Sequence, residues 1–370
     1  MKKYSPLAFL FSLLFAVSAY AGEGRYTLPL TGGGWSLWLD KEASWQNDRL
    51  YLPHEITDLS LLPVNTPTGG WQALNDNLDA VSVEVPGTVE EYLTTSDNPR
   101  PEDFKGVSWW YRKITIPADQ ANKRHLIYFE SVRMRAEVYL DGKLVAYDLI
   151  GETPFHVDIT KEAKPGTEQL LAVRVTNPGG NFHWQGFDIQ KWGEYNIPPA
   201  RSFSGIIGRV KLESVNPVFI SDIYMQNTPE PTKVNAIISF TNETPSSVKQ
   251  DVELTVSEKN RPDKVVFRQL LKHVSFPPGK REMMIPVSVS DAKLWDLDTP
   301  ELYTCNIQIK KGKNTRDRDK KNFGFRWFSA EGVGTDAVLR LNGRRVMLRS
   351  AISWGYFPVT GLIATPEMAE

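Results

Sequence analysis

The side chains best suited to chemistry gather in one long, turn-rich segment, residues 177–204. Among its aromatic residues are Phe182, Trp184, Phe187, Trp192 and Tyr195. Indole and phenol rings combine an apolar face with a polar edge, so they either fill a core or stack against a sugar ring. A loop of this length in a compact domain is usually functional or disordered, and its aromatic content argues against disorder. We therefore expect a functional loop.

Other chemistries find little support in the sequence. The five histidines, at positions 54, 125, 156, 183 and 273, show no metal-ligand spacing. No Gly-rich phosphate loop follows a strand and opens a helix, and no Ser/His/Asp assignment follows from residue order. The single cysteine, Cys305, alternates with Ile307 and Ile309 and is expected in a core. We expect no metal and no cofactor.

Composition places the chain among ordinary globular proteins of two or three domains. It has 370 residues, 41% of them hydrophobic and 24% charged, with a formal net charge of −1. This balance gives no reason to expect nucleic acid or an acidic membrane surface as a partner. The 11 tryptophans leave two roles open, core packing and sugar stacking.

The first 21 residues are typical of a cleaved leader. Lys2 and Lys3 precede the apolar run 7–17, and Ala19-Tyr20-Ala21 has small residues at the cleavage positions. The run is shorter than the roughly 20 residues of a transmembrane anchor. No cysteine lies near the cleavage site, so we do not expect lipid attachment there. We expect a periplasmic or secreted protein without a transmembrane anchor.

Residues 22–215 show the alternating pattern of short strands. Trp110, Arg112, Ile114 and Ile116 form one face of such a strand, and Asp141-Gly142 predicts a hairpin turn. The absence of a long helical period predicts an all-β jelly roll.

Residues 216–329 predict a second sandwich, which begins near Pro217. About seven alternating strands over about 110 residues favour an immunoglobulin-like fold. The charge run 310–321 surrounds Gly312 and is expected to be a solvated hairpin tip.

Residues 330–370 change in character. Asn342-Gly343 predicts a type I′ turn, and residues 345–349 form an apolar-rich run suited to a buried strand. Thr365-Pro366-Glu367 is typical of a helix start. Together with the aromatic, turn-rich segment 353–358, the hairpin, the strand and the helix start predict the opening of a βα-repeat domain.

A collinear set of motifs resembles glycoside hydrolase family 2, the β-galactosidase, β-glucuronidase and β-mannosidase family. The segments are VPGT at 85–88, GVSWWYR at 106–112, VYLDGK at 138–143, TPF at 153–155, DIT at 158–160, SGIIGRV at 204–210, LWDLDTPELY at 294–303, FGFR at 323–326 and LNG at 341–343. Leu297 stands where the family often has proline. Together the segments span nearly all of the chain after the leader.

The resemblance implies an activity as well as a fold. The family hydrolyses O-glycosidic bonds with retention, using two glutamates on late strands of a (β/α)₈ barrel. Such a barrel needs about 250 residues, and residues 339–370 offer one strand and a helix start. The chain is thus expected to be the N-terminal, non-catalytic part of an exported β-glycosidase, truncated at the start of the barrel, with no catalytic residue of its own. The dipeptide Asn242-Glu243 resembles the acid/base motif but falls in a predicted turn.

The resemblance also points to six substrate-binding candidates. Loop 177–204 precedes the strand from which family galactosidases reach the active site, which suggests Asp188, Trp192, Tyr195 and Arg201. Trp354 and Tyr356 would follow the first barrel strand, at its active-site end. No histidine follows Arg349, unlike in familiar galactosidases and glucuronidases. The expected partner is an oligosaccharide or polysaccharide; a stand-alone carbohydrate-binding or structural β-sandwich protein is the alternative.

Overall fold

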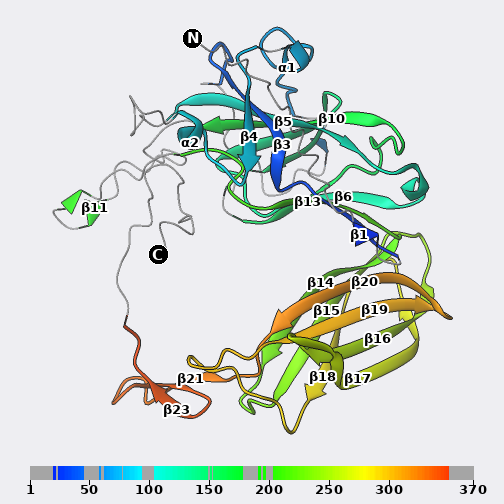
Figure 1. Cartoon of the computed structure of the whole chain (residues 1–370), viewed down its shortest axis with the longest axis vertical. Helices are drawn as coiled ribbons and strands as arrows, with labels where there is room; N and C mark the ends of the chain where they lie inside the picture. The colour runs from blue at the N-terminus through cyan, green and yellow to red at the C-terminus, as the bar shows by residue number, and fades with distance from the viewer. Residues whose placement is uncertain are drawn as a thin grey trace, which may run out of the picture.

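The computed structural model describes residues 20–21, 24–45, 58–59, 62–76, 78–93, 104–148, 151, 153–177, 191–192, 195–196 and 203–349. Nearly all regular structure in these residues is β, in two sandwiches that lie one above the other in Figure 1. The all-β prediction is confirmed. The described helical segments are short: α1 (Ala73–Asp76), α2 (Val89–Leu93) and a 3₁₀ turn, η2 (Ala118–Gln120).

The first sandwich packs a five-stranded sheet on a six-stranded one, and all described pairs are antiparallel. The first sheet has the order β1 (Tyr20–Ala21), β2 (Tyr26–Pro29), β13 (Val210–Val215), β6 (Arg124–Phe129), β9 (Phe155–Asp158). The second has the order β4 (Val81–Val85), β3 (Gly32–Asp40), β5 (Gly106–Thr115), β10 (Glu168–Asn177), β7 (Arg135–Leu140), β8 (Lys143–Asp148).

The alternating pattern explains the core between these sheets. Trp110, Val173 and Val138 lie opposite one another across β5, β10 and β7, and each is fully buried. Successive side chains point to opposite faces of a strand, so Trp109, next to Trp110, lies on the outer face. It is fully buried there too, because Trp71 and Leu74 from the α1 region cover that face.

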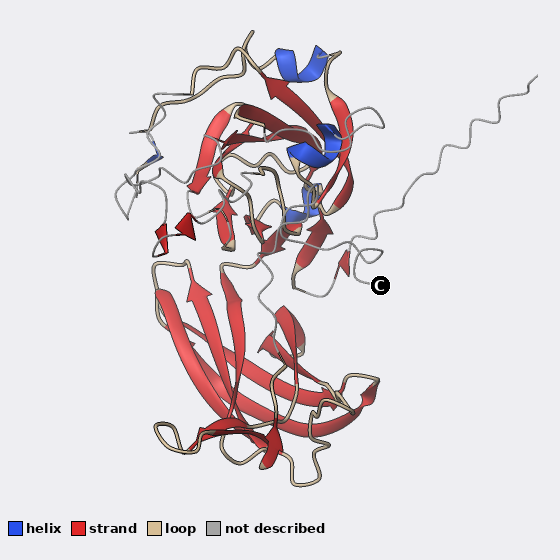
Figure 2. Ribbon diagram, turned by 90° about the vertical axis from the view of Figure 1, so that its left-hand side faces the viewer, coloured by secondary structure: helices blue, strands red, loops and turns tan. Residues whose placement is uncertain are grey.

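The second sandwich packs a three-stranded sheet on a four-stranded one. It forms the lower half of Figure 2. The orders are β14 (Val218–Asn227), β15 (Lys233–Asn242), β18 (Gly279–Ser288) and β17 (Arg261–Phe276), β16 (Val248–Glu258), β19 (Tyr303–Lys311), β20 (Asn314–Phe323). Phe240, Leu254 and Ile307 contribute to an apolar core between the sheets. Cys305 is buried in it as expected, and burial raises the pKa of its thiol to about 12.

A small third sheet follows, formed by β21 (Phe328–Glu331), β22 (Val338–Leu341) and β23 (Arg344–Val346). Asn342 and Gly343 have φ of 51° and 80°, which fits the predicted type I′ turn. The expected buried strand at 345–349 is wrong for the described residues: β23 ends at Val346, and Met347 and Leu348 are 73% and 66% exposed. No described strand pairs with β23 on its other side. The predicted helix start at Thr365 lies outside the described residues.

The predicted solvated tip at 310–321 is partly wrong. Gly312 has a φ of 64° and forms the turn between β19 and β20, as expected. Asp317, however, is fully buried. It faces the first sandwich rather than solvent, because Arg25 reaches it from there.

Candidate functional site

The structure leaves the side chains of the six candidate substrate-binding residues outside the described part. Asp188, Arg201, Trp354 and Tyr356 lie outside it altogether. The backbones of Trp192 and Tyr195 pair with each other in a two-residue hairpin, β11 (Lys191–Trp192) with β12 (Tyr195–Asn196). Their assignment to a sugar site stays a prediction.

The described residues do show how loop 177–204 is anchored at both ends. Asn177, fully buried at the end of β10, donates a side-chain hydrogen bond to the Phe104 carbonyl at 2.7 Å. At the other end, the Ser204 amide donates to Glu90 Oε2 at 3.2 Å, and Glu90 Oε1 accepts from the Phe104 amide at 3.1 Å. The buried Glu90 carboxylate on α2 thus holds one end of the loop directly, at Ser204, and the other end, Asn177, through Phe104.

Gly205 closes this anchor at a place where only glycine fits. Its φ is 153°, and a Cβ there would lie 2.9 Å from Thr88 Cα and 3.0 Å from the Trp110 ring. Its amide donates to the Arg133 carbonyl at 2.6 Å, and its carbonyl accepts from the Arg133 amide at 2.8 Å. The Arg133 guanidinium packs 4.1 Å from the centre of the Phe203 ring. The Ser-Gly of the SGI segment therefore fixes the exit of the loop.

A buried ionic row runs under the same end of the sandwich, on the outer face of the six-stranded sheet. Glu137 lies opposite Arg174 in the β7–β10 pair, and Trp109 lies opposite Arg174 on the other side. Arg174 Nη1 is 3.1 Å from Glu137 Oε2, and Arg135 bonds the other carboxylate oxygen. Glu137 and Arg174 are 1% and 2% exposed.

Neutral donors complete the shell around the Glu137 carboxylate. Asn65 Nδ2 donates to Glu137 at 2.8 Å, and the Asn65 amide donates to the Tyr139 hydroxyl at 3.2 Å. Burial raises the pKa of Tyr139, and the Glu137 charge raises it further. Buried charges are rare unless they are paired. Because these groups are enclosed, the row is suited to holding the sheet end and its loop in place rather than to contacting a ligand.

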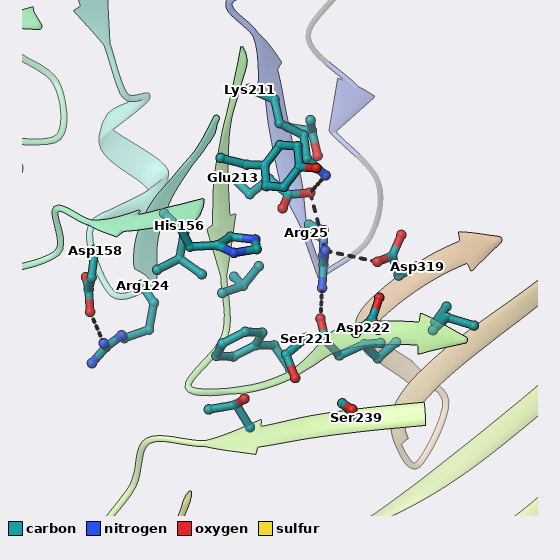
Figure 3. A pocket seen from close by; sticks show the side chains of 18 of the residues that line it. Arg25, Arg124, His156, Asp158, Lys211, Glu213, Ser221, Asp222, Ser239 and Asp319 are labelled. Carbon is teal, nitrogen blue, oxygen red and sulfur yellow. Dashed lines mark hydrogen bonds and ion pairs between the residues drawn. The ribbon is translucent and has the colours of Figure 1, made fainter. Parts of the chain in front are cut away.

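The second candidate location is a cleft of about 1070 Å³ between the two sandwiches. Figure 3 shows Lys211, His156 and Arg25 projecting into it from the first sandwich, with Asp222 and Ser239 on the side of the second. Its charges are largely paired: Lys211 lies 3.0 Å from Glu213, and Arg124 is paired with Asp158.

Charge pairing also sets the pKa values in this cleft. Burial acts to raise the pKa of Glu213, but Arg25 and Lys211 outweigh burial and lower it. Burial lowers the pKa of His156, despite the opposing Glu213 charge. The cleft is larger than the roughly 300–1,000 Å³ of most small-molecule sites and most of its charges are already paired. It has the character of a joint between domains.

Sequence reasoning found the loop but missed the residues that hold it. Glu137 and Arg174 were not singled out, because a charged residue on the polar face of an alternating strand predicts solvent exposure. Glu90 lies on the short helix α2, and its partners Phe104 and Ser204 are distant in sequence. The sequence offers one indication of the loop anchor: the SGI segment at 204–206, which stands between the loop and the strand that follows it.

The described residues contain no cluster of three or more His, Cys, Asp or Glu side chains arranged to hold a metal ion. Among the same residues, no helix has the length and apolarity needed to cross a bilayer. In the Asn242-Glu243 dipeptide, the asparagine holds the backbone of the turn that follows β15. Its side chain donates hydrogen bonds to the carbonyls of Ser246 and Phe276.

Comparison with known proteins identifies both sandwiches. Residues 70–204 match the model for the sugar binding domain of glycosyl hydrolases family 2, and residues 218–326 match the model for glycosyl hydrolases family 2. The matches follow one another along the chain and together cover more than half of it.

Individual relatives are longer than this chain. A beta-glucuronidase of Formosa agariphila is 26% identical over 269 residues, which are 69% of this chain and 26% of that protein. A beta-galactosidase of Thermoanaerobacter pseudethanolicus is 25% identical over 263 residues, 71% of this chain and 33% of that protein. The chain thus spans about a quarter to a third of the length of these two relatives.

A solved structure shows the same fold. The apo structure of the β-glucuronidase from Ruminococcus gnavus superposes with a TM-score of 0.60 at 21% identity, over 90% of this chain and 49% of that one. The ordered motifs, the two sandwiches and the two family matches agree, and the chain belongs to glycosyl hydrolases family 2.

Proposed function

We propose that this chain supplies the sugar-binding and connecting modules of a retaining β-glycosidase that hydrolyses O-glycosidic bonds in oligosaccharides, and that it does not itself cleave them. The observation that carries the proposal is the anchored loop of the first sandwich. Glu90, Asn177 and Gly205 fix both ends of an aromatic-rich segment, within a module that matches a sugar binding domain.

In this proposal the loop side chains contact the substrate. Trp192 and Tyr195 supply ring faces for stacking, and Asp188 and Arg201 supply hydrogen bonds to hydroxyl groups. Trp354 and Tyr356 line the same site from the segment after the third sheet. Retaining hydrolysis requires two carboxyl groups about 5–5.5 Å apart, and we assign neither to a residue of this chain. Relatives named beta-glucuronidase and beta-galactosidase support a glycoside as substrate.

The test is a paired assay of binding and turnover on the 370-residue chain. Aryl β-galactoside, β-glucuronide, β-mannoside and β-glucoside should show no hydrolysis above buffer, while oligosaccharides should bind. Trp192→Ala should weaken binding severalfold. Tyr224→Ala, at a 55% exposed tyrosine of the second sandwich, is the control and should leave binding unchanged. Turnover that disappears on replacement of one glutamate by glutamine would overturn the non-catalytic role.

We also propose that the chain is exported and loses residues 1–21. The supporting pattern is the basic start, the apolar run and the Ala-Tyr-Ala ending. N-terminal sequencing of the protein from the periplasmic or secreted fraction should begin at Gly22. The variant Ala21→Arg, which removes the small residue at the cleavage position, should accumulate uncleaved. Mature protein that retains Met1 would contradict export by this route.

A further inference from the structure

One arginine of the first sandwich makes most of its hydrogen bonds to the second. Arg25 immediately precedes β2, yet its Nε and Nη2 donate to the two carboxylate oxygens of Asp317 on β20, at 2.9 and 2.8 Å. Nη2 also donates to the Ile220 carbonyl at 2.6 Å, where β14 begins the second sandwich. The third nitrogen, Nη1, donates to Glu213 at 3.3 Å and to Asp319 at 3.4 Å. A guanidinium has five N–H donors, and here each has an acceptor, as Figure 3 shows in part.

Asp317, the main acceptor in this contact, relies on Arg25 to compensate its buried charge. The Asp317 side chain is fully buried, and its remaining described partner is the Ile220 amide, which donates at 2.7 Å. The Arg25 side chain is 10% exposed. Burial acts to lower the pKa of Arg25, but the bonds to Asp317 and the charges of Glu213 and Asp319 outweigh it and raise the pKa. A carboxylate buried in the second sandwich is thus neutralised by a side chain of the first.

The backbone next to Arg25 is fitted just as closely. Gly24 has a φ of 98°, and a Cβ there would lie 2.8 Å from the Asp317 amide nitrogen and closer still to the Arg316 carbonyl. Its carbonyl accepts from Lys123 Nζ at 2.9 Å and from Asn216 Nδ2 at 3.2 Å. Asn216 also donates to the Arg316 carbonyl. The chain from Gly24 to Arg25 is therefore wedged between β20 and the connection from β13 to β14.

We infer that Gly24 and Arg25 form a clasp that fixes the angle between the two sandwiches, with Arg25 as its positioning residue. A cleft of about 1070 Å³ lies beside the clasp, so the two sandwiches do not pack face to face there. Packing in that region therefore does not fix the angle between them. Domains joined by a short linker move relative to each other unless their interface is large and apolar. A buried, fully bonded arginine supplies a directional contact instead. The inference does not depend on the proposed glycosidase function.

The experiment measures the distance between the sandwiches in the full chain. Spin labels attached at two exposed positions, Lys113→Cys on β5 and Leu270→Cys on β17, report that distance; Cys305 is buried and does not compete. Arg25→Ala should broaden the distance distribution and lower the melting temperature by about 10 °C. Arg209→Ala is the matched control: Arg209 also lines the cleft but bonds Glu130 within the first sandwich, and it should change neither.

A second variant separates positioning from stability. The double substitution Arg25→Met with Asp317→Leu removes both buried charges, so most of the lost stability should return. The broad distance distribution should remain, because apolar contacts lack the direction of the bidentate pair. If the double variant, or Arg25→Ala itself, keeps the narrow wild-type distribution, Arg25 only stabilises and the clasp is refuted. Gly24→Ala should broaden the distribution as well, because its Cβ has no room.

Discussion

The two sandwiches bury apolar side chains in the same way but bury charge in different places. In the first, Glu137 and Arg174 lie on the outer face of a sheet, under the segment around Asn65 and next to the base of loop 177–204. In the second, the most deeply buried acid among the described residues is Asp317, at the joint between the domains. The central core positions of both are apolar. Buried charge thus marks the places where separate parts of this chain must be held in one geometry.

The largest expected effect concerns the ionic row of the first sandwich. Glu137→Ala leaves Arg135 and Arg174 buried without their carboxylate, which should cost about 3–5 kcal/mol and lower the melting temperature of that sandwich by about 10 °C or more. Calorimetry with hydrogen exchange locates the loss. The pair Glu137→Leu with Arg174→Met should be milder than Glu137→Ala; an equal or greater loss would show that the charges themselves are needed.

A comparable loss in the second sandwich should come from its apolar core. Leu254→Ala removes a fully buried side chain and should cost about 2–5 kcal/mol through lost burial and the cavity left behind. Exchange protection should fall in β16 and β19 and stay unchanged around β7 and β10. Loss of protection in both sandwiches would mean that they unfold as one cooperative unit.

Acid sensitivity should distinguish the first sandwich through His125. The His125 side chain is 2% exposed, and its Nδ1 lies 2.9 Å from Ser214 Oγ. Burial lowers the pKa of His125 below the ordinary 6.5. The Asp158 charge opposes this shift, and the Lys123 charge adds to it. A lowered pKa means that the folded state binds the proton less well than the unfolded state. The contribution of His125 to stability is therefore present above pH 6.5 and lost as pH falls below it.

The measurement is the melting temperature of the first sandwich between pH 7 and pH 5, for wild type and for His125→Gln. Glutamine keeps a hydrogen-bonding group near Ser214 but does not titrate. The decline on acidification should be smaller in the variant. Identical declines would assign the acid sensitivity to other groups.

The smallest effect belongs to a surface pair on the same sheet as the buried row. Lys113 and Glu168 lie 2.9 Å apart across β5 and β10, but their side chains are 63% and 56% exposed. Exposed pairs contribute about 0–1 kcal/mol and are screened by salt. Lys113→Ala should therefore change the melting temperature little, and raising the salt concentration should remove the remaining difference. A loss as large as that of Glu137→Ala would undo the contrast between buried and exposed charge.

Much of the fold follows from local sequence. Asp141-Gly142 has φ of 48° and 79°, as its hairpin turn requires, and Asn342-Gly343 behaves in the same way. Cys305 lies in the core because it shares an alternating face with Ile307 and Ile309. In each case the deciding physics acts within a few residues, in turn geometry or in the alternation of a strand.

The candidate site was predicted less completely. The sequence singled out loop 177–204 by its length and aromatic content, and the structure describes its anchors. Trp192 and Tyr195 remain predictions, as do the other candidates of that loop and of residues 350–370. Glu90 gave no sign of its role, because it meets Ser204 across 114 positions of the chain.

By itself, the sequence determined the all-β class, the hairpin turns and the family, since these depend on residue order and short-range alternation. The tertiary structure alone decided which charged residues are buried. Arg174 stands on a strand face that alternation assigns to solvent, and Asp317 lies opposite Ile309 on a strand with little apolar content; each is enclosed by segments from far along the chain. Arg25 meets Asp317 across 292 positions. No local pattern encodes such a contact, because burial depends on what packs above a side chain and not on its neighbours in sequence.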